Sequence, residues 1–379
     1  MDNEAFEQVE QALRSGGPAA GFAALAGRAL LDKDYRLLLE VRLLEKRWEL
    51  GLPLIQSGPL EDLPEAARRP YEEAFVAAAR EVGGLFLGAG DIPSAWPYFR
   101  AISEPAPVAA AIEKVQPGEG LDRVIEIAFL EGVHPYKGFE LILACHGACR
   151  AISSFEQYPA RAGRDDCARL LVRTLHRDLV ERLRRTIAEA EGTMPETERV
   201  PDLIAGRDWL FGEYSYYIDT SHLLSVVRYS GELDDPETLG LAVELTDYGR
   251  CLSQHFQYRG DPPFENVCAD YGIYLRALLG QDPDSAVAHF RRKVAESDPE
   301  QAGTAAAQVL VALLARLGRY GEAIDVSVEH LPAPDPGRRL VCPSTLELCQ
   351  MAGDWERLRR LARQQGDLVG FVAAALKKT

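Results

Sequence analysis

The chain has 379 residues, of which 47% are hydrophobic and 26% charged, so it has enough apolar side chains for a large core, and wholesale disorder is excluded. Its 58 acidic and 42 basic residues give a formal net charge of -16, which disfavours a nucleic acid or an anionic membrane surface as partner. Seven scattered cysteines, no apolar stretch long enough to span a bilayer and no secretory leader predict a cytoplasmic protein.

Helical periodicity dominates the sequence. Apolar residues recur every three to four positions, as in the stripe of Leu37, Val41, Leu44 and Trp48, which another helix must cover. Runs that alternate apolar and polar residues are scarce, and the β-branched residues are dispersed among strong helix formers. The sequence therefore predicts an all-α fold, with several subregions or one long array of helices.

The first region, residues 1–117, is expected to form helix hairpins. In the run from Leu87 to Pro93, glycine closes one helix and Asp91 caps the next. Such punctuation joins two helices through a short turn, so a helix hairpin is expected there.

The second region, residues 118–263, shows no repeat period. Its longest predicted helix runs from Asp166 to Ala190, and the polar, proline-bracketed segment 191–201 is predicted to be an exposed loop. An irregular helical centre flanked by repeats is expected, with any site in that centre.

Histidine and carboxylate side chains are concentrated in this centre. Together they are ligands for zinc, iron or manganese, and they are also the usual acid–base pair. His134 is expected at the start of a helix, because Pro135 follows it. His222 is expected in the first turn of a helix that Asp219 or Thr220 caps. The candidate ligands of a divalent transition metal are His134, Glu140, His176, Glu213 and His222.

Structural interpretations compete with the metal site. His176 falls on the apolar stripe of its predicted helix, so it points inward, where a carbonyl or a carboxylate can satisfy it. Asp219 and His222 are equally compatible with a capping interaction. Cys145 and Cys149 are predicted to be small buried hydrophobes, because no matching pair completes a zinc site.

Aromatic residues are dense after residue 205. Tyrosine has an apolar body and a polar tip, so these side chains suit the wall of a groove for a small molecule or a peptide. Core packing between helices is the alternative. The candidate ligand-binding residues are Trp209, Tyr214, Tyr216 and Asp219.

The third region, residues 264–379, has turns at a regular spacing. Gly280, Gly318 and Gly353 each lie in a predicted turn between helices, and successive turns are 38 and 35 residues apart. Within Leu314–Ile324, leucine, glycine, aromatic and alanine residues stand in the order of the tetratricopeptide repeat. The chain thus resembles the tetratricopeptide-repeat family, best over residues 303–332.

The resemblance implies an α-solenoid of stacked hairpins over residues 65–115 and 264–379, whose concave face binds a protein or a peptide. The sequence departs from the family pattern at the turn Gly280–Ala286, which is one residue longer, and at Leu358, where a small residue is expected. No peptide-binding residue of the family is carried over to this chain.

Two functions from different classes follow. The first is a helical-repeat scaffold that binds a protein or peptide partner and needs no catalytic residue. The alternative is a metal-dependent or small-molecule-binding enzyme with a histidine and carboxylate site in the central region; a structural or oligomerisation module is a third. No phosphate-binding loop, dinucleotide fingerprint or nucleophile elbow appears, which disfavours nucleotide-dependent and α/β-hydrolase chemistry.

Overall fold

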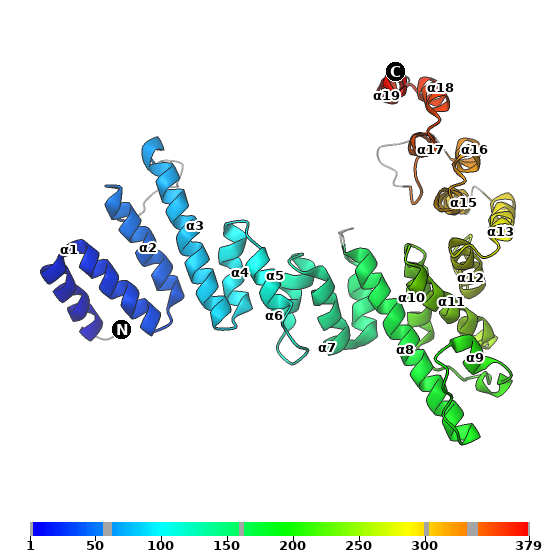
Figure 1. Ribbon diagram of the computed structural model, residues 1–379, viewed down its shortest axis with the longest axis horizontal. Helices are drawn as coiled ribbons and strands as arrows, with labels where there is room; N and C mark the ends of the chain where they lie inside the picture. Colours follow the sequence, from blue (N-terminus) through cyan, green and yellow to red (C-terminus); the bar gives the residue numbers. More distant parts are fainter. Residues whose placement is uncertain (1–2, 56–62, 159–162, 299–302, 332–339, 378–379) are drawn as a thin grey trace. The chain divides into compact units, whose positions relative to one another are not determined.

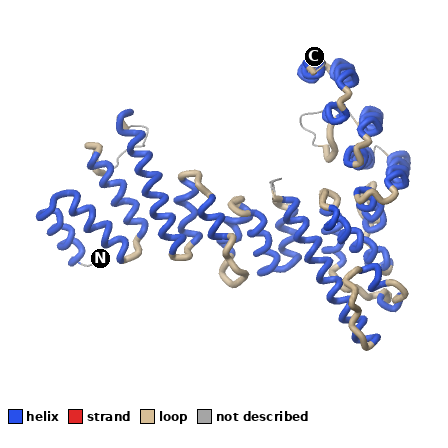
Figure 2. Tube along the Cα trace, viewed as in Figure 1, coloured by secondary structure: helices blue, strands red, loops and turns tan. Residues whose placement is uncertain are grey.

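The computed structural model describes residues 3–55, 63–158, 163–298, 303–331 and 340–377. These residues form helices joined by short loops and contain no β-strand (Figure 2), which confirms the all-α prediction. The chain divides into two compact units, Met1–Ala151 and Ile152–Thr379. The three regions named from the sequence rest on repeat pattern rather than on contacts, and they stay a prediction.

Helices of the first unit pack on their neighbours in the sequence (Figure 1). α2 lies between α1 and α3, and α4 packs on α3. The helices are α1 (Asn3–Leu31), α2 (Tyr35–Glu49), α3 (Glu65–Gly88), α4 (Ile92–Ala101), α5 (Ala106–Ile112), α6 (Asp122–Ile125) and α7 (Pro135–Glu156), whose last residues belong to the second unit.

Two of these helices are broken at a glycine. Gly17 in α1 has φ of 71°, and the chain folds back there, so that Leu13 packs on Gly21: a Cβ at Gly21 would lie 2.3 Å from Leu13 Cδ2. Gly147 breaks α7 in the same way, with φ of 78°. Cys149, two residues after the break, is exposed and Cys145 is half-buried, so the prediction that both are buried hydrophobes is wrong.

The apolar stripes of α1, α2 and α3 form one core. Leu38 and Val41 of α2 are fully buried against Ala29 and Val82. Trp48, expected on the same covered stripe, is exposed over 45% of its surface, so the neighbouring helices cover only part of the stripe. The apolar stripe predicts which face of α2 points inward. It does not predict how much of that face the neighbouring helices bury.

In the second unit, a long helix packs against several others. α8 contacts α9, α10 and α11, and α11 in turn packs on α12. α8 runs uninterrupted over 28 residues, which confirms the long helix predicted near Asp166–Ala190. The helices are α8 (Arg164–Glu191), α9 (Val200–Ile204), α10 (Thr220–Ser230), α11 (Pro236–Cys251), α12 (Val267–Leu278), α13 (Pro283–Glu296), α15 (Ala305–Arg316), α16 (Tyr320–His330), α17 (Thr345–Ala352), α18 (Trp355–Gln365) and α19 (Leu368–Leu376).

From α12 onward each described helix packs on the next one along the chain (Figure 1). The predicted turns are present, because Gly280, Gly318 and Gly353 all have a positive φ and each separates two helices. α15 and α16 form the hairpin of the best-matching segment 303–332, whose last residue lies outside the described residues. Helix hairpins follow one another over this part of the unit.

Candidate functional site

Two loops of the second unit meet next to α10. We call residues 205–219, between α9 and α10, the first aromatic loop, and residues 252–266, between α11 and α12, the second aromatic loop. Ser253 Oγ donates a hydrogen bond of 2.7 Å to the carbonyl of Glu213, which joins the two. The rings of Tyr216 and Phe256 pack edge to face with centroids 5.1 Å apart. Segments 40 residues apart thus form one surface.

The first aromatic loop is held in place by a buried tyrosine of α11. The Tyr217 N–H donates to Tyr248 Oη at 2.7 Å, and Tyr217 Oη donates to the Leu210 carbonyl at 3.1 Å. Burial raises the pKa of Tyr248 to about 12, so its hydroxyl stays protonated at neutral pH. Tyr217 and Tyr248 therefore act as internal supports of the loop.

Asp219 ends the first aromatic loop as the N-cap of α10. Its Oδ1 accepts hydrogen bonds from the Ser221 N–H at 2.9 Å and the His222 N–H at 3.3 Å. A further hydrogen bond from the Ser221 hydroxyl is the main reason why the pKa of Asp219 lies below its ordinary value. The predicted cap is confirmed, and it places His222 in the first turn of α10.

Backbone and side-chain hydrogen bonds fix the second aromatic loop. Gln257 Nε2 donates to the Leu252 carbonyl at 2.8 Å, and the Gly260 N–H donates to the Glu265 carbonyl at 3.0 Å. Lys293 of α13 forms an ion pair with the Glu265 carboxylate. These contacts hold the loop on both sides of Tyr258, whose side chain is exposed.

Four aromatic side chains of the two loops are open to solvent. Tyr214 is 71% exposed, Tyr216 53%, Tyr258 54% and Trp209 48%. We call these four side chains the aromatic patch. Tyrosine and tryptophan are the side chains that most often anchor a partner at a protein interface. The prediction that Trp209, Tyr214 and Tyr216 line a binding surface is compatible with this exposure.

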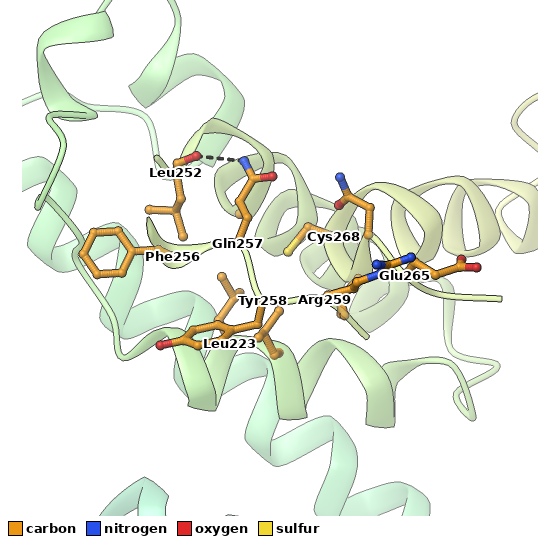
Figure 3. A pocket seen from close by; sticks show the side chains of 12 residues that line it. Leu223, Leu252, Phe256, Gln257, Tyr258, Arg259, Glu265 and Cys268 are labelled. Atoms are coloured by element: carbon orange, nitrogen blue, oxygen red, sulfur yellow. Dashed lines mark hydrogen bonds between the residues drawn. The ribbon is translucent and has the colours of Figure 1, made fainter. Parts of the chain in front are cut away.

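A small cavity of about 120 Å³ opens between α10, the second aromatic loop and the start of α12 (Figure 3). Figure 3 shows Phe256 at one side and Arg259 with Glu265 at the other. Burial raises the pKa of the Cys268 thiol in its wall to about 12, which keeps the sulfur protonated and unreactive at neutral pH. The lining residues are Leu223, Leu224, Gly249, Leu252, Phe256, Gln257, Tyr258, Arg259, Glu265, Asn266, Val267 and Cys268.

Of the five candidate metal ligands, His134 and Glu140 lie in the first unit. His134 precedes α7, as predicted, and its Nε2 lies 2.8 Å from Glu113 Oε2. Glu140 forms an ion pair of 3.1 Å with Lys137. These two candidates therefore have different partners.

The other three candidates lie in the second unit. His176 is buried and its Nε2 lies 2.8 Å from Glu244 Oε2, which is the arrangement that its structural interpretation predicts. Glu213 Oε1 lies 3.8 Å from His255 Nε2. Over the part of the chain that the structure describes, no group of three or more histidine, cysteine, aspartate or glutamate side chains is arranged to hold a metal ion.

The sequence did not single out His255, Tyr258 or Cys268. Phe256 and Tyr258 belong to the aromatic-rich stretch after residue 205. That richness in aromatic residues is the signal by which the sequence could have identified them. No local pattern indicates that the second aromatic loop contacts the first, because a loop-to-loop contact leaves no periodicity in the sequence.

Comparisons with protein-family models, with curated proteins and with solved structures give no match for this chain. Among the described residues, every helix is too short or too polar to cross a lipid bilayer.

Proposed function

We propose that this chain is a helical-repeat scaffold that binds a protein or a peptide through the aromatic patch. The observation that carries the proposal is the exposure of Trp209, Tyr214, Tyr216 and Tyr258 on two loops that contact each other. Tyr258 also lines the cavity of about 120 Å³. Burying aromatic side chains gives a large apolar contact area at a small cost in side-chain entropy, because each ring has only two rotatable bonds. The anchored loops hold these side chains ready for a partner.

The packing of the helices supports the repeat part of the proposal. From α12 to α19 the contacts run from each described helix to the next, which is the pattern of repeats that bury their apolar faces only by stacking. The α15–α16 hairpin turns at Gly318, and the α17–α18 hairpin turns at Gly353. A tetratricopeptide-like array over this segment accounts for both observations.

The size of the cavity favours a peptide side chain over a small-molecule substrate. Pockets for small molecules have volumes of about 300–1,000 Å³, several times that of this cavity. Leu223, Leu252 and Val267 give part of its wall an apolar character. A single apolar side chain of a peptide, inserted next to the aromatic patch, fits this geometry.

Binding is also favoured over catalysis by the chemistry of the surrounding groups. Asp219 is engaged as a helix cap, and the Cys268 thiol stays protonated because burial raises its pKa to about 12. His176 and Glu244 are paired with each other away from the cavity lining. No observation on the described residues favours the metal-dependent alternative, so it is not carried further.

Selection of peptides on the full chain tests the proposal. Random peptides displayed on phage are selected on immobilised wild-type protein, and the affinity of enriched peptides is measured by fluorescence anisotropy. We expect Tyr214→Ala and Tyr258→Ala each to weaken binding about 10- to 30-fold, which is the loss of about 1.4–2 kcal/mol typical of an interface anchor.

Tyr136→Ala is the matched control, because Tyr136 of α7 is also an exposed tyrosine and lies outside the aromatic patch. Its affinity for the same peptides should stay within about twofold of wild type, as expected for a side chain that makes no contact. Equal binding by all three variants, or no enrichment of any peptide on wild-type protein, would contradict the proposal. Circular dichroism verifies that each variant is folded.

A further inference from the structure

Helix α19 has an apolar side chain or a glycine at every position. Its sequence, LVGFVAAAL, contains no polar side chain, yet only Ala374 is buried. Leu368 is 78% exposed, Val369 80% and Val372 53%. A helix that is hydrophobic on all sides is normally covered on all sides, because each exposed aliphatic side chain forfeits the free energy of leaving water. The outer face of α19 has the character of an interface.

Cationic side chains of α18 and of the residue after α19 lie close to aromatic rings of these two helices. The guanidinium groups of Arg359 and Arg363 on α18 lie 5.8 and 5.3 Å from the ring centre of Phe371, and Lys377 Nζ lies 5.8 Å from the ring of Trp355. Residues 355–377 carry five basic and two acidic side chains in a chain whose net charge is -16. The surface is therefore an apolar face with a basic rim, and its complement is an apolar face with an acidic rim.

The first part of α1, up to the break at Gly17, has that complementary character. Phe6, Val9 and Leu13 are spaced along one helical face, and Phe6 is 65% exposed. Between residues 3 and 16 the chain carries three glutamates and one basic residue, Arg14. The exposed glutamates on this segment include Glu4 and Glu10.

We propose that the chain associates head to tail with a second copy of itself, with α19 of one copy packed on the first part of α1 of the next. The exposed aliphatic side chains Leu368, Val369 and Val372 would then be covered by Phe6 and Val9 of the neighbouring copy. Arg359 and Arg363 of α18 would face the glutamates of α1, whereas Arg357 is already paired with Asp325 of α16. This self-association is independent of peptide binding by the aromatic patch.

Other occupants of the α19 face fit the charges less well. Two α19 faces packed on each other would bring their basic rims together, which is unfavourable. A membrane surface would attract the basic rim but would repel a chain with a net charge of -16. An apolar segment with acidic residues on a second copy would bury the apolar face of α19 and also place negative charges next to its basic rim.

A head-to-tail contact joins two different surfaces, so it continues from copy to copy unless it closes into a ring. Sedimentation velocity of the full chain over a range of concentrations should show a mass that grows beyond the dimer or stops at a closed ring. We call the first part of α1 the head and the α19 face the tail. Val372→Glu places a charge in the tail, and Phe6→Glu places a charge in the head. Each variant alone should be monomeric, with association weakened about 30-fold or more, as for loss of an interface anchor.

Mixing the two variants gives the decisive measurement. Val372→Glu keeps an intact head and Phe6→Glu keeps an intact tail, so an equimolar mixture should form a one-to-one dimer and nothing larger. Val328→Glu is the matched control, because Val328 of α16 is 50% exposed and lies outside both surfaces. This variant should associate like wild type, and circular dichroism checks the folding of all three.

A charge-reversal pair gives a second measurement that introduces no charge into the apolar faces. Arg363→Glu should weaken association, and mixing it with Glu10→Arg should restore part of it, because opposite charges then face each other across the contact. A wild-type chain that is monomeric at all concentrations overturns the proposal. So does a Phe6→Glu variant that still dimerises alone, which would indicate α19 packed on α19. A monomeric wild-type chain that sediments with phosphatidylserine vesicles would assign the face to a membrane instead.

Discussion

The pair of His176 and Glu244 shows how a single buried residue finds its partner in the fold. His176 of α8 lies on the inward face that the sequence predicts, and Glu244 of α11 accepts hydrogen bonds from His176 and from the Val200 N–H, which lies 2.9 Å away. Burial by itself raises the pKa of Glu244. The two hydrogen bonds, with the charge of Arg199 nearby, outweigh burial and leave the pKa below its usual value of 4.5. Glu244 thus joins α8, α9 and α11.

Replacement of Glu244 should therefore destabilise the second unit. Glu244→Ala leaves the His176 ring and the Val200 N–H without an acceptor, and we expect the free energy of unfolding to fall by about 2–4 kcal/mol at pH 7. Urea unfolding, monitored by circular dichroism, measures this decrease in the free energy of unfolding. Glu237→Ala on the same helix, where the carboxylate is exposed, is the control and should change stability by less than about 0.5 kcal/mol.

The same pair gives the direction of a pH effect. Because the pKa of Glu244 is lower in the folded than in the unfolded chain, its contribution is complete above pH 4.5 and is lost as the pH falls through the folded value. The difference in stability between wild type and Glu244→Ala should therefore narrow below pH 4.5. A difference that stays constant down to pH 3 would contradict the role of the ionised carboxylate.

At the scale of the elements, glycine decides where helices end and turn. The turns predicted at Gly90, Gly280, Gly318 and Gly353 are all present with a positive φ. Gly17 and Gly147, which also have a positive φ, break helices at places that the helical periodicity alone does not reveal. A break of this kind shows in the backbone dihedral angles, whereas the apolar spacing continues on both sides of it.

The break at Gly147 should be sensitive to any other residue. An L-residue at φ of 78° is strained, so we expect Gly147→Ala to lower the free energy of unfolding by about 1–2 kcal/mol. Gly84→Ala is the control, because Gly84 lies inside α3 and a Cβ there would meet open space. It should leave stability unchanged or raise it by about 0.5–1 kcal/mol. Thermal unfolding measures the change in stability of both variants. Equal changes would show that an alanine at position 147 causes no backbone strain.

On the scale of the whole molecule, the contacts are distributed unevenly. α11 packs on α8, α9, α10 and α12, and its Leu245 and Tyr248 are fully buried. α19 packs on α18, and Ala374 is its one buried residue. Local stability is expected to follow the burial of each helix rather than a single global value.

Hydrogen exchange should reveal this gradient. In the Phe6→Glu variant, which keeps α19 intact and is expected to be monomeric, amides of α19 should exchange roughly 100-fold faster than those of α11, because little apolar surface holds α19 closed. In the wild-type chain at high concentration, protection of α19 should rise if a second copy covers it. Equal protection of α11 and α19 in the monomer would contradict the gradient.

The sequence by itself determined the features that depend on neighbouring residues. Helical periodicity, the Asp219 cap, the start of α7 after His134 and the glycine turns all arise from interactions within a few positions, so they can be predicted from local patterns. The inward orientation of His176 follows from the same periodicity. The exposure of Trp48 does not follow from periodicity, because it depends on how much of α2 the neighbouring helices cover.

Only the tertiary structure decided which distant groups meet. Glu244 is 68 residues from His176, and Ser253 is 40 residues from the Glu213 carbonyl that it contacts. The sequence selected Trp209, Tyr214 and Tyr216 by composition, but the contacts of Tyr214 with His255 and of Tyr216 with Phe256 in the second aromatic loop arise only in the folded chain. Such contacts arise when whole helix faces leave water together, and the sequence carries no local record of which faces those are.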